Sequence, residues 1–247
     1  MNSSPTRVEA WLERRFPPYR YGAVFVLLVI TYVVVSASPP DISTRVVAVV
    51  LEGVTLLVTL VASRVGRLLF RIAVFAVVGA IVAVVVSLLW GSSSTISGWF
   101  FAVDVLLVAA APVAIAHALY RRPVIDIRTV LGAICIYLLI GIMFAFVYAT
   151  IAALGPGAFF VQTDDPGIQT FLYFSFVTQT TVGYGDYTAA SDFGRSIATI
   201  EALLGQIYLV TVVAVLVGRM TVIHRGSERP DATAPVEDAA PAPAPRD

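Results

Sequence analysis

Five consecutive residues, from Thr181 to Gly185, have the composition of a backbone that can replace the water around a cation. The glycines at positions 183 and 185 can adopt positive φ angles, so that successive carbonyl oxygens turn toward one axis. Thr181 adds a hydroxyl oxygen to its carbonyl oxygen. Several copies of this segment would form rings of oxygens around a dehydrated ion. The expected ion-binding residues are Thr181, Val182, Gly183, Tyr184 and Gly185.

The residues before this segment predict a short helix over Ile168–Gln179. It is too short to cross a bilayer, since a span needs about 20 residues. Asp165 can cap this helix, and Pro166 suits its first position. Non-helical backbone is tolerated at membrane depth only where it lines a cavity inside the protein. We therefore expect a re-entrant helix whose C-terminal end, near Gln179, directs its partial negative charge toward the ion path.

The composition indicates the environment in which these residues act. Of 247 residues, 58% are hydrophobic and 13% are charged, and the mean hydropathy is +0.88. A soluble domain is roughly 45–50% apolar and roughly 25% charged. The apolar runs are continuous rather than alternating, which predicts an all-α membrane protein with six transmembrane helices. The expected spans are Tyr21–Ala37, Arg45–Ala62, Ile72–Trp90, Trp99–Tyr120, Thr129–Leu154 and Gly194–Gly218.

The distribution of arginine predicts the orientation. All 16 basic residues are arginine. With both termini in the cytoplasm, 14 arginines lie inside and two, Arg45 and Arg195, lie outside. A secretory signal cleaved near residues 36–38 is the alternative for the first span, and its loss would leave the other five in the same orientation.

The expected parts of the chain are these: an N-terminal interfacial helix over 1–20, a four-helix domain over 21–120, a linker over 121–128, a pore domain over 129–218 and a disordered cytoplasmic tail over 219–247. The inner rim carries arginines that either bind anionic lipid headgroups or only set the topology. They are Arg64, Arg67, Arg71, Arg121, Arg122 and Arg128.

Over Thr129–Gly218 the sequence resembles the tetrameric potassium-channel superfamily, and specifically its bacterial members with six spans and one pore. The motif is Thr-Val-Gly-Tyr-Gly at Thr181–Gly185, the selectivity filter of that family. Over the first four spans the resemblance is one of layout only. It implies a homotetramer of identical subunits in the bacterial plasma membrane, with K⁺ bound at Thr181, Val182, Gly183 and Tyr184. K⁺ would be the permeant ion, and no cofactor is expected.

The resemblance also implies roles for neighbouring residues. Tyr173, Thr180 and Asp186 are expected to support the filter, with Tyr173 donating to Asp186. Gly205 is either a hinge of the last helix or a site of close packing. Many members of that family carry a glutamate where this chain has Val177.

The first four spans do not resemble a voltage sensor. Such a sensor needs an arginine or lysine at about every third position of the fourth span. The expected span Trp99–Tyr120 contains no basic residue except His117. Glu52 and Asp104 form either a proton- or cation-responsive pair, or two separate carboxylates that reach water or Arg45. Glu201, in the last span, makes either a structural contact or one that takes part in gating.

These observations predict a passive potassium-selective channel gated by a stimulus other than steep voltage sensing. The alternative is a non-conducting membrane sensor or scaffold that retains a filter. A transporter would be expected to show repeated halves with broken helices. We expect neither an enzyme nor a nucleic-acid-binding protein, since the sequence offers no nucleophile–base set.

Overall fold

The computed structural model of the chain describes residues 20–39, 42–63, 66–90, 94–120 and 127–227. Within these ranges the structure is helical, apart from loops and one isolated β-bridge between Phe160 and Ala189. The helices are α2 (Arg20–Ala37), α3 (Ile42–Ala62), α4 (Arg67–Trp90), α5 (Ser94–Tyr120), α6 (Ile127–Leu154), α7 (Ile168–Gln179) and α8 (Asp192–Ser227). Almost all of the predicted N-terminal helix and linker, and the tail beyond residue 227, lie outside the described residues.

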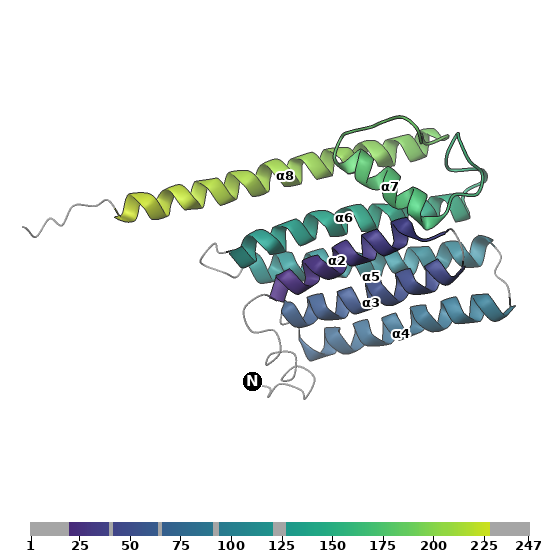
Figure 1. Cartoon of the computed structure of the whole chain (residues 1–247), viewed down its shortest axis with the longest axis horizontal. Helices are drawn as coiled ribbons and strands as arrows, with labels where there is room; N and C mark the ends of the chain where they lie inside the picture. The colour runs from purple at the N-terminus through teal and green to yellow at the C-terminus, as the bar shows by residue number, and fades with distance from the viewer. Residues whose placement is uncertain (1–19, 40–41, 64–65, 91–93, 121–126, 228–247) are drawn as a thin grey trace, which may run out of the picture.

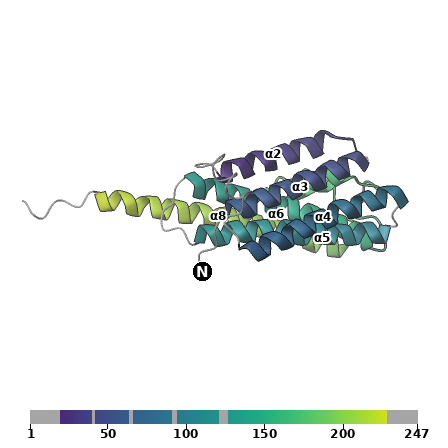
Figure 2. The same ribbon diagram turned by 90° about the horizontal axis from the view of Figure 1, so that it is seen from below.

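The long helices lie side by side in an elongated bundle, with α6 at its centre (Figure 1). Helices α2 and α5 pack along α6, and α3 packs against α2, α4 and α5. The short helix α7 lies at one end of the bundle, between α6 and α8, and the second view shows α8 extending well past the opposite end (Figure 2). The four-helix domain and the α6–α8 unit therefore form one packed body around α6.

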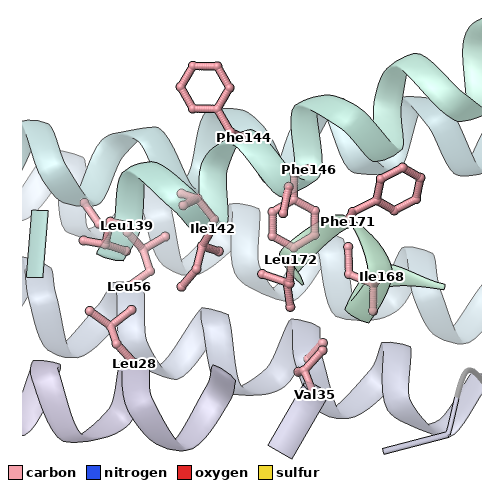
Figure 3. Packing of buried hydrophobic residues seen from close by; sticks show 14 of the residues in the cluster. Leu28, Val35, Leu56, Leu139, Ile142, Phe144, Phe146, Ile168, Phe171 and Leu172 are labelled. Atoms are coloured by element: carbon pink, nitrogen blue, oxygen red, sulfur yellow. The ribbon is translucent and has the colours of Figure 1, made fainter. Parts of the chain in front are cut away.

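One hydrophobic core joins the two parts of the chain. Leu28 of α2, Leu56 of α3 and Ile142 of α6 are each less than 5% exposed and belong to one cluster (Figure 3). The same cluster contains Leu172 and Phe171 of α7. Because α7 shares its core with α2 and α6, its position depends on both.

Among the described residues, three helices are long and apolar enough to cross a membrane: Gly98–Tyr120, Thr129–Leu154 and Asp192–Val215. The apolar parts of α2, α3 and α4 are shorter, at Tyr21–Ala37, Val46–Ala62 and Phe70–Val82. The all-helical, membrane-protein part of the prediction is therefore supported, and six spans with a re-entrant helix remain a prediction.

The end of α8 differs from the expected one. The prediction placed disorder from Arg219, directly after the last span, but the helix continues to Ser227. The residues from 219 to 227 include no proline, and the first proline after the span is Pro230. Since proline is the strongest helix breaker, composition alone placed the boundary too early.

Gly53 marks a close approach between α3 and α4, and a Cβ added there would lie 2.5 Å from Cγ1 of Val77. Gly53→Ala should therefore lower stability by about 1–3 kcal/mol through overpacking. Gly79→Ala in α4 is the matched control, because nothing lies within 4 Å of its added Cβ. Thermal unfolding in detergent should show a lower midpoint for the first variant only. Equal midpoints for Gly53→Ala and the wild type would contradict this packing.

Candidate functional site

Helix α7 has the predicted bounds, Ile168–Gln179, but not the predicted N-cap residue. Gly167 is its N-cap residue, with extended backbone (φ −72°, ψ 165°), and no side chain caps the helix. The prediction that Asp165 caps the helix with Pro166 in its first turn is therefore wrong. The extended conformation of Gly167 leaves Pro166 outside the first turn, so Asp165 is too far along the chain to reach the first amides.

The filter segment, Thr181–Gly185, begins directly where α7 ends. The carbonyl oxygen of Val177 accepts hydrogen bonds from the amides of Val182 at 3.0 Å and Gly183 at 3.3 Å. The amide of Thr181 donates to Thr178 at 2.9 Å. These bonds close the last turn of α7 and turn the chain into the segment.

The backbone of the filter segment alternates in handedness. Gly183 has a φ of +55° and Gly185 a φ of +79°, as expected for both glycines. Thr181 also has a positive φ, +59°, which the sequence did not predict because a β-branched residue disfavours this region. In the single chain every residue from 181 to 186 is exposed, with Val182 52% and Tyr184 71% accessible.

Asp186 follows the filter segment and is tied to α7. The hydroxyl of Tyr173 donates to Oδ2 of Asp186 at 2.7 Å, the contact expected from the sequence. This hydrogen bond raises the pKa of Tyr173 to about 12, so the phenol stays protonated and remains a donor. The hydroxyl of Thr180 instead donates to the carbonyl of Phe176 in its own helix, at 2.6 Å.

Behind α7 lies a buried carboxyl group. Glu201 of α8 has no exposed surface; the hydroxyl of Tyr148 of α6 donates to Oε2, and the hydroxyl oxygen of Ser175 of α7 lies within hydrogen-bond distance of Oε1. The structure thus gives Glu201 the polar contact that was one of its two predicted roles. The sequence did not identify Tyr148 and Ser175 as the partners of Glu201. An acid inside a membrane needs hydrogen-bonding partners, but the sequence does not show which helix faces provide them.

Gly205 lies against the end of α7. A Cβ added there would lie 2.8 Å from both the carbonyl oxygen and Cγ of Gln179. The side-chain amide of Gln179 donates to the carbonyl of Tyr137 at 2.9 Å, which joins the same point to α6. Gln206 approaches the segment itself, with Nε2 3.4 Å from Oγ1 of Thr181. Close packing therefore accounts for the glycine, whereas hinge bending stays a prediction.

Glu52 and Asp104 are brought together, as their pairing requires. Both line a cavity of about 20 Å³ between α3, α4 and α5. A second cavity of about 20 Å³ adjoins Glu52 and is lined also by Thr31 of α2 and Leu139 of α6. Each cavity is about large enough for one water molecule and too small for an organic ligand.

Within the described ranges, no group of three or more His, Cys, Asp or Glu side chains could hold a metal ion.

Gly205→Ala should move α8 away from Gln179, because the contact at 2.8 Å is with a backbone oxygen that cannot rotate aside. We expect a loss of stability of about 1–3 kcal/mol and reduced ion flux. Gly79→Ala in α4, with nothing within 4 Å of its added Cβ, is the control. Thermal unfolding and liposome flux measure the two effects, and wild-type values of both in Gly205→Ala would refute the packing described here.

Comparison with known proteins supports this site. Residues 136–222 match a family model described as an ion channel, and they include most of α6, all of α7, the filter segment and most of α8. No curated protein and no solved structure gave a significant match. The match supports passive ion conduction through a membrane by the part of the chain that holds Thr181–Gly185.

Proposed function

We propose that this chain is one subunit of a homotetrameric potassium channel. The observation that carries the proposal is the backbone of the filter segment, in which Thr181, Gly183 and Gly185 have positive φ and the residues between them do not. Such alternation lets consecutive carbonyl oxygens point to one side, where they can replace the hydration shell of K⁺. K⁺ would bind along Thr181, Val182, Gly183 and Tyr184.

The oligomer follows from geometry. One segment forms one side of an ion path, and the remaining sides have to come from identical copies around an axis. The exposure of the filter segment in the single chain fits this arrangement. Along α8, apolar side chains are also exposed and would meet neighbouring subunits or lipid: Ile200, Leu203, Leu204, Ile207, Val210 and Val213.

The proposed placement has six spans, both termini in the bacterial cytoplasm and the filter segment near the outer surface. It rests on the arginine distribution, in which Arg45 and Arg195 alone lie outside. Of the inner arginines, Arg67 and Arg71 lie at the described start of α4, where they could meet anionic headgroups. Arg64, Arg121 and Arg122 lie outside the described residues.

Ion selectivity tests the proposal and its geometry together. The wild type should strongly prefer K⁺ over Na⁺, and Gly183→Ala should abolish this preference because a Cβ at φ +55° costs about 1–2 kcal/mol per subunit. Gly157→Ala, in the loop before α7 with nothing within 4 Å of its added Cβ, is the control. The measurement is the bi-ionic reversal potential in a planar bilayer.

A wild-type reversal potential near zero for K⁺ against Na⁺ would contradict the proposal of a potassium-selective channel. Absent conductance with intact tetramers would favour the alternative, a membrane sensor or scaffold that retains a filter. Wild-type selectivity in Gly183→Ala would refute the assigned backbone geometry.

The conductance–voltage curve should be shallow, equivalent to about one charge or fewer per subunit, since one charge crossing the full field contributes about 2.3 kcal/mol per 100 mV. Helix α5 carries no arginine, and Glu52 and Asp104 both line one small cavity. Any response to external pH should run through this pair.

Glu52→Gln and Asp104→Asn should each alter the dependence of conductance on external pH, whereas Asp164→Asn, at an exposed loop position, should not. The curve is measured in symmetrical K⁺ at several external pH values. A steep sigmoid that neither substitution changes would show that the four-helix domain senses voltage by another route.

A further inference from the structure

Glu201 is enclosed where three helices meet. Its side chain in α8 is 0% exposed, as are those of Tyr148 in α6 and Ser175 in α7. The hydroxyl of Tyr148 donates to Oε2 of Glu201, and the hydroxyl oxygen of Ser175 lies within hydrogen-bond distance of Oε1. Each carboxyl oxygen thus faces a different helix, and the side chain joins α8 to both.

The number of hydrogens at this point is limited. Oγ of Ser175 also lies 2.6 Å from the carbonyl oxygen of Gly141 in α6. A serine hydroxyl carries one hydrogen and can donate it to one of these two acceptors. If Ser175 donates to Gly141, its short contact with Glu201 needs a hydrogen on the carboxyl group. One proton on Glu201 then completes an unbroken series of donors, from Tyr148 to Glu201 to Ser175 to Gly141.

Within the described residues, no cation lies near Glu201 that could stabilise it as a charged carboxylate. The ion pair that α8 makes joins Arg195 to Asp192 at 3.5 Å, at the exposed start of the helix. The titratable groups that face Glu201 from α6 are the phenols of Tyr148 and Tyr137, and α7 presents the hydroxyl of Ser175. A buried carboxylate without a positive partner is costly, whereas a hydrogen-bonded neutral acid is not.

We propose that Glu201 is a positioning residue for the filter segment and that it acts as a neutral carboxylic acid, donating to Ser175 and accepting from Tyr148. The proposal rests on the channel function proposed above. Ser175 precedes Val177 by two residues in α7, and the carbonyl of Val177 holds the amides of the filter segment. Fixing Ser175 therefore fixes the helix end from which the ion-binding backbone starts.

Substitutions at position 201 separate this role from simple space filling. Glutamine can donate to Ser175 through its amide nitrogen and accept from Tyr148 through its oxygen, so Glu201→Gln should keep the K⁺/Na⁺ permeability ratio within about twofold. Glu201→Leu fills a similar volume without either bond, and the loss of two buried hydrogen bonds should lower the ratio about tenfold or more. Gly157→Ala, in the loop before α7 with nothing within 4 Å of its added Cβ, is again the control.

A wild-type permeability ratio in Glu201→Leu would overturn the positioning role. A ratio in Glu201→Gln as low as that of Glu201→Leu would overturn the neutral acid, since it would show that the carboxylate itself is required.

A second measurement does not depend on conduction. The infrared difference spectrum of the wild type minus Glu201→Gln, in the purified full-length chain, should contain the C=O stretch of a protonated carboxylic acid. Tyr148→Phe removes the hydroxyl that donates to Oε2 and should move this band to higher frequency. Absence of the band, or a band that Tyr148→Phe leaves unmoved, would overturn the proposed series of donors. A wild type that shows the band but does not select K⁺ would refute the channel function and leave the series intact.

Discussion

The carbonyl oxygen of Val177 accepts two amides of the filter segment, and the other contacts of the site serve to hold this oxygen in place. Residues 181–185 have no regular partner strand, so their conformation is inherited from the end of α7. Helix α7 has only twelve residues and no side-chain cap, and an isolated helix of that length is marginal in water. Its position must therefore come from packing against its neighbours.

That packing comes from both sides of α7. Toward α8, Glu201 bonds to Ser175, and Gly205 allows a backbone approach to Gln179. Toward the four-helix domain, the ring of Tyr32 in α2 meets Phe176 edge-on, with centroids 5.1 Å apart. Helix α2 thus contacts the helix that ends in the ion-binding backbone, which gives the four-helix domain a direct mechanical path to it.

Local features of the site could be predicted, and contacts between helices could not. The bounds Ile168–Gln179 and the positive φ of Gly183 and Gly185 follow from composition and from the freedom of glycine. The partners of Glu201 depend on how α6, α7 and α8 are rotated about their axes. Spans that are apolar on all faces carry almost no directional signal, so their sequence leaves that rotation undetermined.

The acid behind α7 and the acid beyond the filter segment both contact α7, two residues apart. Asp186, after the segment, is bound by Tyr173 in α7, while Glu201 binds Ser175 two residues further along the same helix. One acid is exposed and the other is fully buried, so solvent and salt weaken the first contact far more than the second. The buried contact is therefore the one that keeps α7 in place when conditions outside change. It thereby also holds the helix end from which Thr181 continues with an unfavourable positive φ.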